Sequence, residues 1–215
     1  MRLRARRLAP RVAAARRSMG DTNTAVALTF DDGPDPDFTP QVLDVLAELK
    51  ATATFFVVGA RAERHPEIVR RIVAQGHQLG SHSYAHPDLW TLSLPEAIDE
   101  YRQGRRTIES IAERPVPLFR PPKGSMNLAQ AAAMRMLGLH TWLWSVDPGD
   151  WRPDATVESI IGGIGDLGPG DVVLLHDAIE RPIEPEATDR SATVAAVPAV
   201  VATARSRGLE LVALW

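Results

Sequence analysis

Short apolar runs alternate with stretches of helical periodicity over most of the chain, and this alternation constrains the fold more than any other feature. Between the runs, apolar residues recur every three or four positions, as at Leu43, Leu46 and Leu49. Ser93, with Glu96 three residues later, forms a capping box that begins another such stretch. We expect strands at 25–30, 53–59, 77–81, 117–120, 140–146, 171–176 and 209–214.

Strands that alternate with helices predict right-handed βαβ units around a parallel sheet, and nearly continuous apolar strands suit a sheet that is buried on both faces. The 215 residues are enough for one such domain. Seven units can form either a doubly wound open sheet or a barrel with one strand fewer than the usual eight. Both architectures bind ligands at the carboxyl ends of the strands, so functional polar residues are expected there.

Composition and charge restrict the sites and partners that the chain can have. The sequence contains no cysteine, so any metal ion must be held by His, Asp or Glu. The net charge of -3 gives no reason to expect a nucleic acid partner. No run of apolar residues is long enough to predict a membrane span.

The start of the chain is strongly basic, with seven arginines in the first 17 residues. We expect residues 1–23 to form a flexible basic extension and residues 24–215 to form a single domain. The longest apolar run in the extension, at 12–15, is too short for the apolar region of a secretory signal. No export signal is therefore visible in this stretch.

Polar side chains gather where the expected strands end, which places them at one edge of the sheet. They are Asp31 and Asp32 after the first strand, His82 and His86 after the third, Arg120 after the fourth, Asp147, Asp150 and Trp151 after the fifth, and His176 with Asp177 after the sixth. Residues scattered over a solvated surface would not concentrate in this way. We interpret this edge of the sheet as an active site.

Asp31 and Asp32 are adjacent, and neighbouring side chains of an extended strand point in opposite directions. One carboxylate can therefore bind a metal ion while the other remains free to accept a proton. His82 and His86 are close enough in sequence to turn both imidazoles toward one point. Two His and one Asp give three protein ligands and leave positions open for water and substrate, which is typical of a catalytic site. Zinc is the first candidate, and cobalt and nickel accept similar ligands.

Two further residues could complete the chemistry. Arg120, if it lies near Asp31, would hold that carboxylate ionised, as a base needs. An imidazolium at His176, kept charged by a carboxylate such as Asp150, would make a suitable general acid for a departing amine. Each has a simpler alternative, which is a salt bridge on the protein surface for Arg120 and a hydrogen-bonded core position for His176.

Five segments together resemble the five motifs of the polysaccharide deacetylases, also called carbohydrate esterase family 4 or the NodB-homology domain. They are TFDDGP, HSYAHP, RPPKG, VDPGDW and VLLHD, in family order and at family spacing, and the resemblance extends over residues 24–215. It implies an α/β fold of the distorted (β/α)7 barrel type. In this family Asp31 would be the catalytic base, tethered by Arg120, and His176 the general acid, supported by Asp150. The implied metal ligands are Asp32, His82 and His86.

The resemblance also implies residues that bind the substrate. Leu174 and Trp151 would line the pocket for the acetyl methyl group and the sugar. Lys123 stands where the family commonly has a tyrosine. The implied oxyanion-hole donor at this position is the backbone N–H, which a lysine retains.

The implied activity is metal-dependent hydrolysis of N-linked acetyl groups on N-acetylglucosamine-type sugars, such as chitin, chitooligosaccharide or peptidoglycan glycan, with release of acetate. The alternatives are an O-acetyl esterase acting on acetylated xylan and a sugar-binding module with a relic site. We expect a monomer whose partner is an acetylated amino-sugar oligomer or polymer. Because most relatives are exported, the resemblance favours an extracellular or cell-envelope location.

Overall fold

The computed structural model describes residues 15–20, 24–180 and 188–215. The strands are β1 (Ala25–Asp31), β2 (Thr54–Val57), β3 (Gln78–Ser81), β4 (Leu118–Phe119), β5 (His140–Thr141), β6 (Val172–His176) and β7 (Glu210–Leu211). The α-helices are α1 (Phe38–Glu48), α2 (Gly59–Arg64), α3 (Pro66–Ala74), α4 (Leu94–Ala112), α5 (Leu128–Met136), α6 (Val157–Ile164) and α7 (Ser191–Ser206). Two short 3-10 helices, η1 (Leu89–Thr91) and η2 (Pro122–Gly124), lie in loops.

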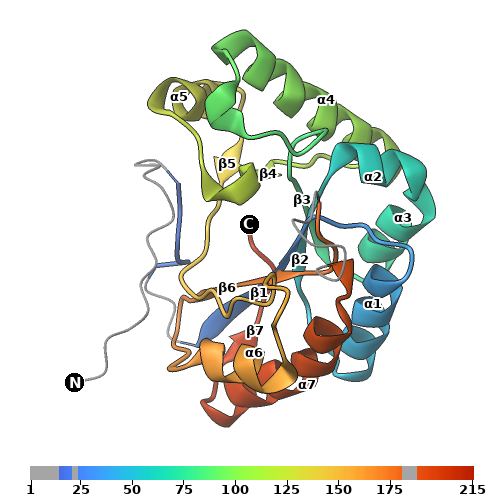
Figure 1. Cartoon of the computed structure of the whole chain (residues 1–215), viewed down its shortest axis with the longest axis vertical. Helices are drawn as coiled ribbons and strands as arrows, with labels where there is room; N and C mark the ends of the chain where they lie inside the picture. The colour runs from blue at the N-terminus through green and yellow to red at the C-terminus, as the bar shows by residue number, and fades with distance from the viewer. Residues whose placement is uncertain (1–14, 21–23, 181–187) are drawn as a thin grey trace.

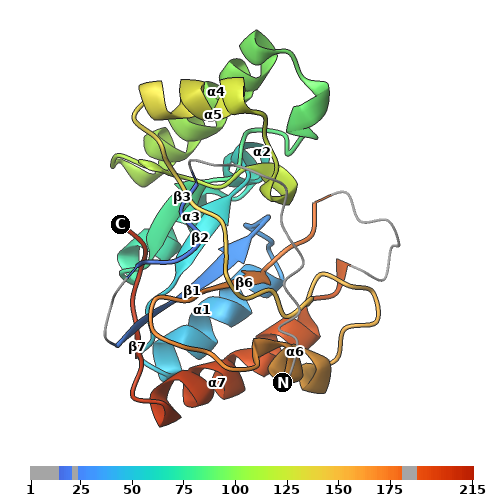
Figure 2. The same cartoon turned by 90° about the vertical axis from the view of Figure 1, so that its left-hand side faces the viewer.

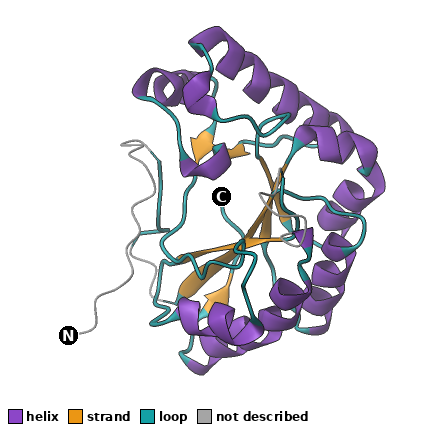
Figure 3. Ribbon diagram, viewed as in Figure 1, coloured by secondary structure: helices purple, strands orange, loops and turns teal. Residues whose placement is uncertain are grey.

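In these residues the strands form one parallel sheet with the order β5-β4-β3-β2-β1-β6, and β7 pairs with the start of β1. The helices form an arc around the outside of the sheet, and the end of the chain lies inside it (Figures 1 and 3). The view turned by 90° shows α4 and α5 above the sheet and α6 and α7 below it (Figure 2). The architecture is therefore the distorted α/β barrel that the resemblance implied.

Each of the seven expected strands is confirmed, but several are shorter than the apolar runs that predicted them. The run at 140–146 is strand only at 140–141. Its neighbour β4 ends at Phe119, and Pro121 and Pro122 soon after lack the N–H groups that would extend the ladder. Beyond β5 the chain is joined to its surroundings by single bridges, among them Val146 to Val173 of β6. Regular strand pairing is therefore interrupted between β5 and β6.

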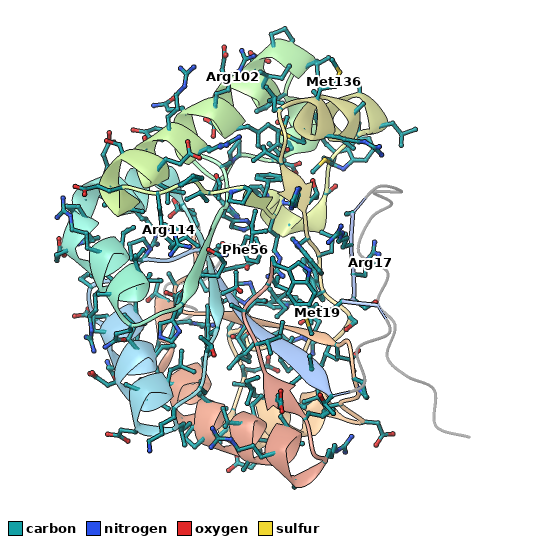
Figure 4. All side chains as sticks on the ribbon, turned by 180° about the vertical axis from the view of Figure 1, so that it is seen from behind. Arg17, Met19, Phe56, Arg102, Arg114 and Met136 are labelled. Carbon is teal, nitrogen blue, oxygen red and sulfur yellow. The ribbon has the colours of Figure 1, made fainter. Side chains whose placement is uncertain are left out.

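Alternation along the strands buries apolar side chains on both faces of the sheet. On β1, Val26, Leu28 and Phe30 face outward into the core beneath the helices, whereas Ala27 belongs to a second cluster inside the barrel. The inner cluster also contains Phe56, which is labelled near the centre of Figure 4, with Leu118, Trp142, Val172 and Leu214. Because the inner face of β1 ends in Asp31, the strand places a carboxylate at the mouth of a filled barrel.

Residues 15–20 of the basic extension contact the barrel. Arg16 donates its N–H to the carbonyl of Thr141 at 2.9 Å, and Leu143 donates to the carbonyl of Arg16 at 2.7 Å. Met19 packs against the inner cluster, and its backbone N–H donates to Gly170 (Figure 4). Most of the predicted extension lies outside the described residues, and the domain boundary at residue 24 stays a prediction.

Helices α1, α3 and α4 confirm the helical periodicity, and α4 has the predicted capping box between Ser93 and Glu96. None of the helices in the described ranges is long and apolar enough to span a bilayer.

Candidate active site

The carboxyl ends of four strands bring the predicted polar residues together. Asp31 is the last residue of β1 and lies in register with His176, the last residue of β6. His82 follows β3 and Arg120 follows β4, on the other side of β1. Residues separated by more than a hundred positions in sequence therefore meet at one edge of the sheet.

Asp32, His82 and His86 form a compact cluster of possible metal ligands. Oδ1 of Asp32 lies 3.3 Å from Nε2 of His82 and 3.3 Å from Nε2 of His86. The three residues are buried, and their donor atoms lie within 4.8 Å of one another. Nδ1 of His82 is 2.7 Å from the carbonyl of Arg120, an arrangement that fixes the ring and aims Nε2 at Asp32. Two imidazole nitrogens and one carboxylate oxygen fit a divalent ion such as zinc.

Charge at this cluster also favours a cation. Burial alone raises the pKa of Asp32, but the imidazoles of His82 and His86 outweigh it and hold the pKa below its ordinary value. Burial lowers the pKa of His86 to about 4, so this imidazole is neutral near pH 7. Burial also opposes the charged form of His82, yet Asp31 and Asp32 raise its pKa. The carboxylates thus draw a positive charge to the cluster, and a divalent ion would supply it.

The segment between the two histidines is held in a strained conformation by α4. Ser83 and His86 have φ of 67° and 52°, in the left-handed region that non-glycine residues seldom adopt. Glu100 of α4 accepts hydrogen bonds from the backbone N–H groups of Tyr84 at 3.1 Å and Ala85 at 2.9 Å. Sequence reasoning missed Glu100, because an acidic residue on an amphipathic helix carries no distinguishing pattern.

Asp31 is fixed by a fully buried arginine. Nη1 of Arg120 donates to Oδ1 of Asp31 at 2.6 Å and to Oγ1 of Thr29 at 2.8 Å. Nη2 of Arg120 donates to the carbonyl of Leu143 at 2.9 Å, and the guanidinium lies 4.1 Å from the centroid of the Phe56 ring. Arg120 has no exposed surface, so its expected place beside Asp31 is observed and its surface alternative is not.

The two adjacent carboxylates diverge for a different reason than the one expected. Simple alternation along a strand was predicted, but β1 ends at Asp31, and Asp32 has φ of 73°. This left-handed turn, rather than continued extension, directs Asp32 toward the histidines. The following Gly33 leaves room for a buried neighbour, because a Cβ there would lie 2.3 Å from a carboxylate oxygen of Asp177.

His176 and Asp150 form a second pair on the other side of Asp31. Nδ1 of His176 lies 2.8 Å from Oδ1 of Asp150, and the His176 backbone N–H donates to Oδ2 at 2.7 Å. Oγ1 of Thr193 also donates to Oδ2, at 3.0 Å, and Nη1 of Arg190 donates to the Asp150 carbonyl at 2.7 Å. Burial lowers the pKa of His176, but Asp150 outweighs it and raises the pKa to about 9. The imidazole is therefore protonated at neutral pH.

Asp147, the other carboxylate of the same segment, does not join this pair. Its Oδ1 accepts hydrogen bonds from the backbone of Gly149 at 3.0 Å and from the indole of Trp151 at 3.3 Å. Sequence reasoning also missed Thr193 and Arg190, which approach Asp150 from the start of α7. Neither residue belongs to a motif whose spacing could have indicated this contact.

The predicted substrate-binding residues lie around the same edge. Lys123 has φ of 56° and an exposed side chain whose Nζ is 3.4 Å from Oδ2 of Asp88. Trp151 follows Asp150 directly and exposes 42% of its surface. Leu174 is buried on β6, two residues before His176 and on the same face of the strand. Their contact with substrate stays a prediction.

The carboxyl edge of the barrel thus carries a cluster compatible with a divalent ion, a carboxylate tethered by Arg120 and a charged imidazole, a combination that hydrolytic sites use. Comparison with known proteins identifies the family. A family profile described as polysaccharide deacetylase matches residues 19–142. The chitooligosaccharide deacetylase of Bradyrhizobium sp. (strain ANU 289) is 40% identical over 207 residues, which cover 92% of this chain and 93% of that protein.

Two further comparisons agree. The peptidoglycan-N-acetylglucosamine deacetylase of Bacillus cereus is 38% identical over 190 residues, 87% of this chain and 84% of that protein. The crystal structure of a peptidoglycan N-acetylglucosamine deacetylase superimposes with a TM-score of 0.86 at 32% identity, over 94% of this chain and 91% of that one. The chain therefore belongs to the polysaccharide deacetylase family and is a deacetylase hydrolase, as the five motifs implied.

Proposed function

We propose that this protein removes N-linked acetyl groups from N-acetylglucosamine-type sugars by metal-assisted hydrolysis and releases acetate. The observation that carries the proposal is the position of Asp31. This carboxylate is held by Arg120 beside the Asp32, His82 and His86 cluster, and it is in register with His176 on the neighbouring strand. The relatives named above act on chitooligosaccharide and peptidoglycan, which supports acetylated cell-wall or chitin-type glycans as substrates.

Asp32, His82 and His86 would hold a divalent ion, for which zinc is our first proposal and cobalt or nickel the alternatives. Such an ion would polarise the acetyl carbonyl and make water a stronger nucleophile. The ligand of the related crystal structure, 4-naphthalen-1-yl-N-oxidanyl-benzamide, carries a hydroxamate group of the kind that chelates metal ions. That chemistry agrees with a cation in the corresponding protein and supports one here.

The protein's own residues would move the protons. Asp31 would act as the base that takes a proton from the attacking water, since Arg120 keeps its carboxylate fixed. His176 would donate a proton to the departing amine, because its pKa of about 9 keeps the imidazole charged at pH 7. With Nδ1 bound to Asp150, Nε2 of His176 remains for the substrate. The backbone N–H of Lys123 is our candidate donor to the oxyanion.

The edge of the site offers surfaces that suit a sugar. Trp151 and Trp90, exposed by 42% and 55%, lie in loops that follow the fifth and third strands. Flat indole faces stack well on the apolar faces of sugar rings. We propose Trp151 as a substrate contact and Leu174 as a wall of the acetyl pocket, and Trp90 as a further contact along a glycan chain.

The experiment is acetate release from chitooligosaccharides and from peptidoglycan fragments, measured with chelator present and again after addition of Zn²⁺ or Co²⁺. We expect activity that the chelator abolishes and the ion restores. Asp31→Asn should retain the ion but lower the rate by about 10²- to 10⁴-fold, the usual contribution of a general base. Full activity in this variant would refute the assignment of Asp31.

Two rival functions give different results in the same assay. An O-acetyl esterase would release acetate from acetylated xylan faster than from chitooligosaccharide. A sugar-binding module with a relic site would release none from any of these glycans although it binds them. The compact Asp32, His82 and His86 cluster, together with the Arg120–Asp31 and His176–Asp150 contacts, supports the enzyme over the relic.

A further inference from the structure

The loop after β6 contacts the proposed metal ligand Asp32 through a backbone N–H. Oδ1 of Asp32 faces both imidazoles, whereas Oδ2 accepts a hydrogen bond from the backbone N–H of Glu180 at 2.9 Å. This second contact sets the rotation of the carboxylate and therefore the direction of Oδ1. Glu180 belongs to an acid-rich stretch at 178–190, of which residues 181–187 lie outside the described ranges.

Arg61 of α2 holds this loop at the peptide group that contacts Asp32. Its Nη2 donates to the carbonyl of Ile179 at 3.0 Å, and its Nε donates to Oε2 of Glu180 at 2.7 Å. The Ile179 carbonyl and the Glu180 N–H belong to one peptide unit, so a single line of hydrogen bonds runs from the guanidinium through this peptide to Oδ2 of Asp32. A donor at the carbonyl polarises the peptide and strengthens the N–H as a donor in turn.

Arg61 is itself fixed in place, which makes it suitable as an anchor. Its side chain is only 16% exposed, and its Nη1 lies 3.6 Å from Oδ2 of Asp35. Asp35 is in turn held at the start of α1, where its Oδ1 accepts hydrogen bonds from the backbone of Asp37 and Phe38. The guanidinium therefore joins α2, the loop before α1 and the loop after β6.

From these contacts we propose that Arg61 is a positioning residue for metal binding, acting through the 179–180 peptide on Asp32. The inference rests on the proposed function only in requiring that the site bind a divalent ion. Residues that orient ligands in this way typically change metal affinity by about 10- to 100-fold when they are lost.

The direction of the change in Zn²⁺ affinity distinguishes a positioning role for Arg61 from a purely electrostatic effect of its charge. Arg61 is a cation near a cation site, so Coulomb repulsion alone predicts that Arg61→Ala would bind Zn²⁺ more tightly. Positioning predicts weaker binding, because the 179–180 peptide that orients Asp32 loses its anchor. Glu180→Ala is a second probe, since it removes the side chain held by Arg61 but keeps the N–H that contacts Asp32.

The test is the affinity of the purified full chain for Zn²⁺, measured by competition with a chromogenic chelator, together with the visible absorption spectrum of bound Co²⁺. We expect Arg61→Ala to weaken Zn²⁺ binding by about ten-fold or more and to alter the Co²⁺ spectrum. Glu180→Ala should weaken it less, and Arg61→Lys should recover part of the loss. The double variant should be no weaker than Arg61→Ala, because both substitutions break one connection.

Arg71→Ala is the matched control, since Arg71 pairs with Asp44 on the outer helices α3 and α1. It should leave both the affinity and the spectrum unchanged. Unchanged or tighter Zn²⁺ binding by Arg61→Ala would overturn the proposal, as would a wild type that binds no Zn²⁺. If Arg61→Ala does not fold, the Zn²⁺ affinities of Arg61→Lys and Glu180→Ala test the proposal instead. Wild-type affinity in both would overturn it. A wild type that binds Zn²⁺ but releases no acetate would refute the proposed function alone.

Discussion

The two sides of the active site use the same kinds of side chain in different arrangements. On one side, one oxygen of Asp32 faces Nε2 of His82 and of His86 at 3.3 Å each. On the other side, Oδ1 of Asp150 faces Nδ1 of His176 alone, at 2.8 Å. The first arrangement turns three donor atoms toward one point, whereas the second leaves one ring nitrogen free to meet a substrate.

Protonation follows from this difference. Burial makes His86 a weak base, with a pKa of about 4, and two rings share a single carboxylate oxygen, so the first side favours an added cation. Asp150 raises the pKa of His176 to about 9, so the second side carries its own proton at pH 7. Two imidazoles that share one carboxylate through Nε2 make a candidate ion site. One imidazole that meets its own carboxylate through Nδ1 makes a candidate proton donor.

The largest effect should come from disrupting the candidate ion site of Asp32, His82 and His86. Asp32→Ala removes the carboxylate of the Asp32, His82 and His86 cluster, and we expect loss of bound Zn²⁺ and a fall in acetate release beyond the roughly 10³-fold typical of losing one oxyanion donor. Metal content by elemental analysis and acetate release check this. Asp44→Ala, on the exposed face of α1, is the matched control and should keep both. Retention of one Zn²⁺ per chain by Asp32→Ala would show that the ligand set is wrong.

Breaking the pair of His176 and Asp150 should shift the pH dependence of kcat/KM. His176 donates its proton only below its pKa, so wild-type kcat/KM should fall as the pH rises through about 9. In Asp150→Asn the largest of the charges that raise this pKa is absent, while burial still lowers the pKa and only Asp31 and Asp32 still raise it. The alkaline limb should therefore shift to lower pH, with a loss of about 10²- to 10⁴-fold at pH 7.

Asp147→Asn provides the comparison for that profile, because it is the same substitution in the same loop on a carboxylate that does not contact His176. Its alkaline limb should coincide with that of the wild type. If Asp147→Asn shifts the limb and Asp150→Asn does not, the partner of His176 has been misassigned.

A smaller effect should come from loosening the histidine segment without touching a ligand. Glu100→Ala removes the acceptor for the N–H groups of Tyr84 and Ala85, which steadies a segment with two left-handed residues. We expect about ten-fold weaker Zn²⁺ binding, with partial recovery in Glu100→Gln, which keeps an acceptor oxygen. Glu109→Ala, lower on the same helix, should not change the affinity. Equal affinity in Glu100→Ala and wild type would contradict this support.

The sequence was sufficient to predict the alternating strands and helices and the polar residues at the strand ends. The strands were predictable from apolar runs, and Asp31, His82, Arg120 and His176 from their places at the ends of those runs. The supporting residues were not predictable. Glu100, Arg61 and Thr193 act through side chains on helices, and their contacts follow from packing rather than from spacing.

Local backbone geometry was the other feature that the sequence could not predict. The left-handed turn at Asp32 has no signature in a pair of aspartates, since the same pair could continue a strand. The contact of Arg16 with Thr141 joins segments 125 positions apart, and the basic composition of the extension gave no indication of it.

The smallest effect should come from the edge of the site, where contacts add to binding but not to the chemistry. Trp90 is positioned as a fixed platform, because its indole N–H donates to the hydroxyl of Ser125 and the backbone of η1 is held by Gln130. Trp90→Ala should raise KM by about 2- to 10-fold for long oligomers, corresponding to about 0.5–1.5 kcal/mol of aromatic contact, with little change in kcat. The effect should diminish as the oligomer shortens, because a short substrate does not reach beyond the acetyl site. Trp215→Ala removes an indole of the same 55% exposure that follows β7, the strand paired with the start of β1, and its kinetics should match the wild type at every length. A KM increase that is independent of oligomer length, or that appears equally in both variants, would remove Trp90 from the glycan-binding surface.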